Sequence, residues 1–119
     1  MSVPWQVEYT DEFEAWWDSL SAEEQEEIAA KVELLEERGP TLGRPHADVI
    51  TTSRHSNMKE LRGKLNERYL RVLFAFDPRR TAILLLGGDK TEDVTWYDTF
   101  VPIADGLFDE HLKELKRKK

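Results

Sequence analysis

Two neighbouring strand-like runs constrain the fold of this chain most strongly, because they carry arginines where apolar residues would be expected. The runs are residues 57–65 and 69–77. Successive side chains of a strand alternate between its two faces, so Glu60 and Arg62 share one face and Arg71 lies on one face of the next run. If all three project from the same side of a sheet, they form an acid–base cluster suited to a phosphodiester. The other face of the second run is apolar and is expected to meet the core: Leu70, Val72, Phe74 and Phe76.

The net charge of −7 conceals a separation of charge along the chain. Residues 1–43 hold twelve acidic and two basic residues, whereas residues 44–80 hold nine basic and four acidic ones. Residues 81–119 return to a slight excess of acid, with eight acidic and six basic residues. The middle third would therefore attract a polyanion, and the flanking segments would repel it.

Length and composition favour one folded domain, residues 1–119. The absence of cysteine excludes disulfides, thiolate catalysis and cysteine-based zinc sites. No apolar stretch approaches the roughly 20 residues that cross a bilayer, and the N-terminus does not read as a signal sequence. We therefore expect a cytoplasmic protein that does not enter a membrane.

The first part of the chain predicts a strand followed by a helical hairpin. Apolar and polar residues alternate from Val3 to Tyr9, as in a strand. Thr10 is placed to cap a helix whose apolar stripe continues to Leu20. Ser21 and Glu24 have the spacing of a capping box, and Gly39-Pro40 would end the second helix.

The remainder predicts a small sheet and a C-terminal helix. Residues 41–56 read as a loop with a short strand around 48–51, and residues 81–86 as a strand covered on both faces. Gly87-Gly88 is expected to end that strand, followed by a loop with Trp96 and Tyr97. A helix around 107–115 and the basic tail Lys116 to Lys119 complete an α+β chain.

Three segments resemble the HigB-type, phage-derived-like branch of the RelE/ParE toxin superfamily: residues 58–62, 71–80 and 87–90. The resemblance runs from the helical hairpin to about Leu112. It implies a RelE-like fold, with an N-terminal strand and a helical hairpin packed on a small, mainly antiparallel sheet, and a C-terminal helix. It further implies the toxin of a type II toxin-antitoxin system: a ribosome-dependent mRNA endoribonuclease (mRNA interferase) that uses no metal or cofactor, inhibits translation and arrests growth.

The resemblance also implies which residues act. The 2′-hydroxyl of a ribose attacks the adjacent phosphate, so the site must accept a proton, donate another and stabilise negative charge. Arg62 and Arg71 match basic active-site positions of related toxins, and Lys90 matches a basic position after the last sheet strand. Glu60 is the candidate base because it shares a face with Arg62. Both guanidinium groups are expected to converge in one hollow open to solvent.

Further residues are candidates for contact with RNA. Trp96 or Tyr97 falls near an aromatic position that stacks on a base or assists proton transfer. His55 and Lys59 are two further candidates for RNA contact, and the His55 imidazole, although in a predicted loop, could also serve as an acid or base near neutral pH. Each candidate also has a structural alternative: the arginines can pack over the sheet, Glu60 can form a salt bridge, and Lys90 can be a solvated turn residue. Trp96 and Tyr97 can anchor their loop in the core.

The expected partners are mRNA on the ribosome and a cognate helix-turn-helix antitoxin, through which alone we expect contact with DNA. The acidic helical hairpin offers a surface for a basic antitoxin. Two other functions stay open: a ParE-like toxin that inhibits gyrase by binding, and a binding or regulatory module that keeps the fold without activity. Replacing both Arg62 and Arg71 by alanine would abolish growth arrest by a nuclease, and we expect the fold to survive.

Overall fold

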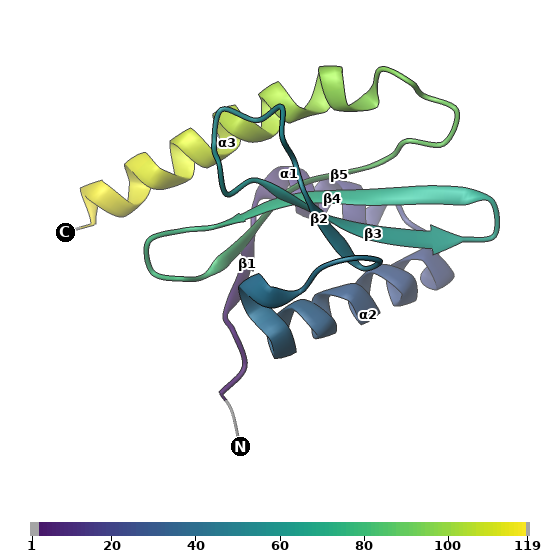
Figure 1. Cartoon of the computed structure of the whole chain (residues 1–119), viewed down its shortest axis with the longest axis horizontal. Helices are drawn as coiled ribbons and strands as arrows, with labels where there is room; N and C mark the ends of the chain where they lie inside the picture. The colour runs from purple at the N-terminus through teal and green to yellow at the C-terminus, as the bar shows by residue number, and fades with distance from the viewer. Residues whose placement is uncertain (1–2, 119) are drawn as a thin grey trace.

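The computed structural model describes residues 3–118, and Lys119 of the predicted basic tail lies outside them. The chain folds into a sheet with helices on both faces (Figure 1). In chain order the elements are β1 (Val7–Tyr9), α1 (Asp11–Asp18), α2 (Ala22–Arg38), the short 3₁₀ helix η1 (Gly39–Thr41), β2 (Ala47–Val49), β3 (Lys59–Leu65), β4 (Arg68–Phe76), β5 (Ala82–Asp89) and α3 (Trp96–Arg117).

The sheet has the strand order β1-β5-β4-β3-β2. β1 runs parallel to β5, and the other neighbours are antiparallel. Helices α1 and α2 pack on one face and α3 on the other (Figure 1). This arrangement confirms the expected α+β fold class, with its N-terminal strand, helical hairpin, mainly antiparallel sheet and C-terminal helix. Within residues 3–118, none of the helices is long and apolar enough to span a membrane.

Side chains fix the starts of the first two helices as the sequence predicts. The Thr10 hydroxyl oxygen accepts the backbone N–H of Phe13 at 3.0 Å and donates to the carbonyl of Leu85 at 2.7 Å. The capping box of α2 is complete, because Ser21 Oγ accepts the N–H of Glu24 while the Glu24 carboxylate accepts the N–H of Ser21. Each cap satisfies donors that a helix start leaves free. Thr10 also joins α1 to the centre of the sheet.

Strand β4 divides the interior into two cores. Leu70, Val72 and Phe74 face α1 and α2, as the alternation predicts. The opposite row is buried as well, since Leu73 and Ala75 pack against α3. A sheet covered on both faces has its polar side chains restricted to edges and to ion pairs.

Gly87 and Gly88 do not end β5, so that expectation is wrong. The strand continues through both glycines to Asp89. A Cβ atom on Gly87 would lie 2.1 Å from the Trp16 ring, and one on Gly88 would lie 2.7 Å from Nε1 of Trp96. The glycines are therefore explained by two indole rings that approach the strand from opposite faces.

The C-terminal helix begins at Trp96, about a turn and a half before Pro102, so the predicted loop around Trp96 and Tyr97 is wrong. Proline lacks the N–H that would bond the carbonyl of Asp98 four residues earlier. Asp98 and Pro102 are both exposed, so water can satisfy that carbonyl. The other boundaries deviate less: β1 is shorter than predicted, and β2 begins one residue earlier.

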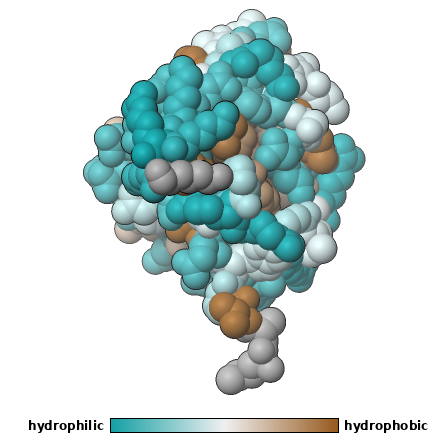
Figure 2. Space-filling view, turned by 90° about the vertical axis from the view of Figure 1, so that its left-hand side faces the viewer, coloured by the Kyte–Doolittle hydropathy of each residue, from teal (hydrophilic) through white to brown (hydrophobic). Residues whose placement is uncertain are grey.

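The turn between β4 and β5 ties α3 and β1 together at one end of the molecule. The buried Asp77 carboxylate contacts His111 Nε2 of α3 and the Arg79 guanidinium, each at 2.8 Å. Arg79 in turn reaches Glu8 of β1 at 2.8 Å. Mostly hydrophilic residues cover the end of the molecule seen in Figure 2, with apolar residues visible in the hollows between them.

Candidate active site

The carboxylate of Glu60 lies at the centre of a group of charged and hydroxyl side chains on the α3 face of the sheet. Its Oε1 accepts the Tyr97 hydroxyl at 2.6 Å and lies 3.3 Å from Nε of Arg71. Its Oε2 accepts Nε of Arg62 at 3.2 Å. Together with Lys90 these residues are called the Glu60 cluster below. The cluster unites β3, β4 and the first turn of α3.

Strand pairing explains why two arginines meet there. Arg62 of β3 stands directly opposite Arg71 of β4 in the antiparallel register. Like charges directly opposite each other on adjacent strands are destabilising, so a shared anion is needed nearby. Glu60 lies two residues before Arg62 and thus on the same face, where its carboxylate contacts both guanidinium groups.

The two arginines differ in their access to solvent. The Arg62 side chain is 31% exposed, whereas the Arg71 side chain is 8% exposed and that of Glu60 is 4% exposed. Arg71 also donates from Nη1 to the carbonyl of Leu70 at 2.9 Å. The expectation of two solvent-reachable guanidinium groups therefore holds for Arg62 and is wrong for Arg71. Removing Arg71 would leave a buried carboxylate short of a partner, which is costly.

Tyr97 and Lys90 have protonation equilibria shifted in opposite directions. Burial, followed by the nearby Glu60 carboxylate, raises the pKa of Tyr97, so its hydroxyl stays protonated and donates to Glu60. Burial and the positive charge of Arg71 lower the pKa of Lys90. The Lys90 ammonium lies 5.3 Å from the centre of the Tyr97 ring. A lysine with a lowered pKa releases its proton more readily, as a general acid requires.

Asp48 is a member of the site that the sequence reasoning missed. Its Oδ2 accepts Nη2 of Arg62 at 3.3 Å and Nε of Arg44 at 2.8 Å. The hydrogen bond from Arg44 is the largest of the effects that lower the pKa of Asp48. The pairing of β2 with β3, which places Asp48 opposite Glu60, is a long-range contact without a local sequence signal.

Lys64 and Tyr69 extend the same face toward the β3–β4 hairpin and were also missed. The Lys64 ammonium lies 5.6 Å from the centre of the Tyr69 ring, and Tyr69 is 40% exposed. The Tyr69 carbonyl accepts the backbone N–H of Lys90 at 3.0 Å, which links the hairpin to the cluster. The alternation that groups Glu60 with Arg62 also includes Lys64, so this signal was available in the sequence.

Three of the proposed site residues lie elsewhere. Lys59 is on the opposite face of β3 from Arg62, where its ammonium donates to the carbonyl of Pro40 at 2.8 Å. His55 pairs with Asp109 of α3 at 2.8 Å. Trp96, the first residue of α3, is 2% exposed and packs in the core between α3 and the sheet. The structure therefore brings Glu60, Arg62, Arg71, Lys90 and Tyr97 together and leaves Lys59, His55 and Trp96 outside the cluster.

Across residues 3–118, no three metal-ligating side chains come together in a group that could hold a metal ion. The other two histidines have protein partners. His46 Nδ1 lies 2.9 Å from the Lys31 ammonium, and His111 lies against Asp77.

Comparisons with known proteins identify the family to which the chain belongs. Residues 15–109 match the family described as phage derived protein Gp49-like (DUF891). Two Mycobacterium tuberculosis proteins with the provisional names toxin HigB2 and toxin HigB3 are 44% and 48% identical to the chain. The first alignment spans 99% of this chain and 59% of that relative, and the second spans 77% of this chain and 80% of that relative. The chain thus covers 59% of the length of the HigB2 relative.

Two solved structures show the same fold. One is free Escherichia coli toxin RelE in a variant with two arginines replaced by alanine, with a TM-score of 0.59, 13% identity and coverage of 84% of this chain and 97% of RelE. The other is the RelE–RelB complex of Pyrococcus horikoshii, with a TM-score of 0.55, 16% identity and coverage of 75% and 98%. This likeness confirms the expected RelE-like fold.

Proposed function

Because the chain belongs to the Gp49-like family of HigB-like toxin homologues and has a RelE-like fold, we propose that it is a toxin that cleaves mRNA on the ribosome. The observation that carries this proposal is the Glu60 cluster. It combines a carboxylate, two guanidinium groups, a phenol and a lysine on one face of the sheet. Attack of a 2′-hydroxyl on the adjacent phosphate requires groups that accept a proton, donate a proton and stabilise negative charge, and this cluster contains such groups.

Each member of the cluster has a distinct role in the proposed reaction. The Glu60 carboxylate accepts the proton of the attacking 2′-hydroxyl. Arg62, the more exposed arginine, binds the phosphate oxygens, on which negative charge increases in the transition state. Lys90 donates a proton to the departing 5′ oxygen, a role that its lowered pKa favours. No metal ion takes part in this sequence of steps.

Arg71 and Tyr97 serve as positioning residues in this scheme. Both hold Oε1 of Glu60, which leaves Oε2 on the side of the exposed Arg62. A buried carboxylate held by two donors keeps one orientation while the substrate enters. Tyr69 and Lys64 would then contact the RNA beyond the scissile phosphate, through stacking and charge.

We expect the proposed toxin to be neutralised by a cognate antitoxin with a helix-turn-helix domain. The Pyrococcus horikoshii neighbour was solved in complex with RelB, which supports the expectation that a RelE-like fold can be held by a second protein. The acidic segment formed by α1 and α2 supports a basic partner surface. The same pairing predicts that expression of this chain alone arrests bacterial growth.

The decisive experiment replaces Arg62 by alanine and uses Arg44→Ala as its matched control. Both arginines bind Asp48, but only Arg62 also contacts Glu60. Arg62→Ala should lower the cleavage rate by about 10²- to 10³-fold, as loss of one transition-state donor does. Arg44→Ala should leave the rate within about threefold, since lost surface ion pairs have small effects. Growth after induction and the mapping of RNA ends by primer extension provide the measurements.

The single variant Arg62→Ala is used instead of a variant that lacks both Arg62 and Arg71, because Arg71 is buried. Loss of Arg71 would destabilise the fold, and a lost activity would then not report on catalysis. A folded Arg62→Ala protein that cuts mRNA at the wild-type rate would remove the basis of the nuclease proposal. DNA damage without new RNA ends would instead favour a toxin that inhibits gyrase.

One observation favours a binding module without catalysis as the second candidate. Six of the nine basic residues in the segment 44–80 already have a carboxylate partner, so little free positive charge remains for RNA: Arg44, Arg54, Arg62, Arg68, Arg71 and Arg79. If induction of the wild-type chain gives neither growth arrest nor new RNA ends, this second function is the better one.

A further inference from the structure

Lys90 and Arg62 each have a side-chain nitrogen that no other residue of the Glu60 cluster binds. Within residues 3–118, the Lys90 ammonium has neither a hydrogen-bond acceptor nor an ion pair, and lies over the Tyr97 ring. Arg62 donates from Nε and Nη2, which leaves its Nη1 without a partner in the same range. No buried side-chain nitrogen or oxygen of the described chain lacks a partner, so both nitrogens are open to solvent.

Strand pairing places these two groups on the same face of the sheet. Arg62 of β3 stands opposite Arg71 of β4, which in turn stands opposite Gly88 of β5. Gly88 has no side chain, and the Trp96 ring occupies the space above it. Lys90 follows two residues later and is therefore the next side chain on the α3 face, where the charges of both arginines act on it.

This position makes Lys90 more reactive at neutral pH than an ordinary surface lysine. Burial is the main cause that lowers its pKa, and the positive charges of Arg71 and Arg62 add to the effect. A larger fraction of neutral amine is then present, and only the neutral form attacks a carbonyl carbon. The Glu60 carboxylate, which favours the charged form, is already bound by Arg62 and Tyr97.

We propose that Lys90 is a site of acylation by acyl phosphates, whose phosphate group binds Arg62 while the acyl carbon meets the Lys90 amine. A guanidinium group binds phosphate oxygens through directed hydrogen bonds. The unpartnered Nη1 of Arg62 can form such a bond without breaking a contact within the protein. A cation that binds the leaving group beside an accessible amine is the arrangement that this reaction needs.

The reaction is complete with these two reactants. Nζ of neutral Lys90 attacks the carbonyl carbon and forms a C–N bond, while the bond from that carbon to the phosphate oxygen breaks. The amine proton leaves with the phosphate as hydrogenphosphate, and Arg62 stabilises the negative charge of this leaving group. The product is an amide without positive charge. That acylation inactivates the toxin rests on the proposed function, because an amide cannot donate a proton to the 5′ oxygen.

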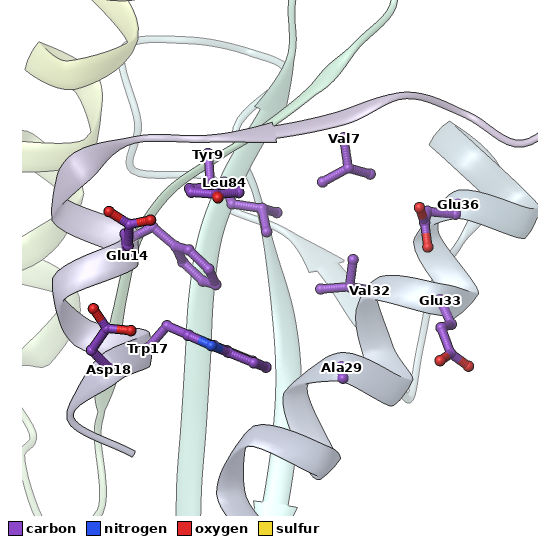
Figure 3. Close-up of a pocket in the computed structure, with 11 residues that line it drawn as sticks. Val7, Tyr9, Glu14, Trp17, Asp18, Ala29, Val32, Glu33, Glu36 and Leu84 are labelled. Atoms are coloured by element: carbon purple, nitrogen blue, oxygen red, sulfur yellow. The ribbon is translucent and has the colours of Figure 1, made fainter. Parts of the chain in front are cut away.

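The opposite face of the sheet presents the contrasting environment. Four carboxylates line the groove between α1 and α2 (Figure 3): Glu14, Asp18, Glu33 and Glu36. They repel an acyl phosphate, which is an anion. Lys31 belongs to the same acidic helix α2, and its ammonium lies 2.9 Å from Nδ1 of His46. Lys31 is therefore a control lysine with a bound amine and acidic surroundings.

Acetyl phosphate is the probe, and peptide mass spectrometry after partial reaction measures the acetylation rate at each lysine. Lys90 should react about tenfold faster than Lys31, Lys64 or Lys113 at the same pH. Lys64 is the closest control, because its ammonium also lies over a tyrosine ring and its side chain is more exposed than that of Lys90. Equal rates at all four lysines would overturn the proposal.

An uncharged reagent separates phosphate binding from the reactivity of the amine. The N-hydroxysuccinimide ester of acetic acid offers the same acyl group without a phosphate. Arg62→Ala should slow acetylation of Lys90 about tenfold with acetyl phosphate and less than about threefold with the ester. Arg44→Ala, at the other arginine bound to Asp48, should change either rate less than about twofold. Equal effects of Arg62→Ala on both reagents would exclude acyl phosphates as the specific donors.

The outcomes bear on Lys90 independently of toxicity, since acetylation is measured on the purified chain without RNA. Circular dichroism verifies that the variants and the acetylated chain are folded. If the wild-type chain cleaves mRNA, acetylation at Lys90 should lower the rate about 10²-fold, as loss of a general acid does. Selective acetylation with unchanged cleavage would support the acylation site and contradict Lys90 as the acid of the proposed function.

Discussion

Glu60 limits what chemistry the α3 face of the sheet can perform, because each of its oxygens is held by different groups. Oε1 is bound by the Tyr97 hydroxyl and lies beside Arg71, and Oε2 is bound by Arg62. The side chain carries the only acidic group within reach of both opposed arginines of β3 and β4 in the described chain, residues 3–118. Its charge therefore matters for the fold and for the proposed reaction.

We predict that Glu60→Gln separates these two effects. Glutamine keeps the shape but supplies no base and leaves Arg62 and Arg71 without a shared anion. The cleavage rate on programmed ribosomes should fall about 10²- to 10⁴-fold, the usual contribution of a general base. The free energy of unfolding, measured in urea, should fall by about 2–4 kcal/mol because two cations lose a buried partner.

Asp48→Asn provides the control for Glu60→Gln, since it removes the other carboxylate partner of Arg62 without touching the proposed base. Its rate should remain within about tenfold of the wild type, as the loss of a partly exposed ion pair is small. A folded Glu60→Gln protein with the wild-type rate would assign Glu60 a structural role alone.

The composition of the cluster was predictable from the sequence only in part. Strand alternation placed Glu60 and Arg62 on one face, because that period is a local property, whereas their meeting with Arg71 depends on the pairing of β3 with β4. The burial of Arg71 depends on α3, which packs over it from more than twenty residues away in the sequence. Trp96 and Tyr97 illustrate the same limit: adjacent positions on one helix point Trp96 into the core and Tyr97 toward Glu60.

At the scale of elements, local signals succeeded where a single side chain decides a boundary. The Thr10 cap, the Ser21 capping box and the end of α2 before Gly39-Pro40 all appear where they were predicted. Gly87-Gly88 failed as a strand end because its cause is the approach of two indole rings, Trp16 and Trp96, which no local pattern reveals. The start of α3 at Trp96 was also not predicted, and the helix runs through Pro102.

The β4–β5 turn supplies the prediction at this scale, because Asp77 ties it to α3. Burial raises the pKa of Asp77, but hydrogen bonds from His111 and Arg79 outweigh that effect, and the net pKa is lowered below its usual value of 3.8. A carboxylate whose pKa is lower in the folded state stabilises the fold above its unfolded pKa. That contribution disappears as the pH falls through the folded pKa.

Asp77→Asn should therefore lower the free energy of unfolding at pH 7 by about 1–3 kcal/mol, since it removes the charge of a buried carboxylate that His111 and the partly exposed Arg79 contact. The loss should shrink as the pH falls below about 4, the pKa of the unfolded state, and should vanish once the pH has passed through the lower folded pKa. Urea unfolding at a series of pH values measures both effects. Asp98→Asn, an exposed position in the first turn of α3, should stay within about 0.5 kcal/mol of the wild type. A pH-independent difference would contradict this account of Asp77.

For the whole molecule, the separation of charge along the sequence becomes a separation across the sheet. Carboxylates of α1 and α2 gather around the groove on one face, and the Glu60 cluster with Lys64 lies on the other. Because most arginines of the central segment are already paired, few cations remain to contact RNA directly. The electrostatic part of RNA binding should therefore be weak for a nucleic-acid enzyme.

We predict that the affinity for RNA depends only weakly on salt concentration, with Lys64 as one contributor to that dependence. The slope of log affinity against log salt for a single-stranded RNA should be shallow, and Lys64→Ala should reduce its magnitude by about 0.7, the contribution of one phosphate contact. Lys113→Ala, on the exposed side of α3 where Lys113 pairs with Glu110, should leave the slope unchanged. Anisotropy titrations with a labelled oligonucleotide over a range of KCl concentrations measure the slopes. Identical slopes for Lys64→Ala and the wild type would exclude the β3–β4 hairpin from the RNA path.

The five-stranded sheet also has a meaning for how such proteins diverge. The buried apolar residues that pack against α1 and α2 differ from those that pack against α3, so we expect substitutions among the acidic residues of α1 and α2 to leave the arginine pair undisturbed. Under the proposed function, we expect a lineage to be able to exchange its recognition partner within a few mutations and retain its chemistry. Closely related copies within one genome could in this way avoid cross-talk while sharing the same reactive groups.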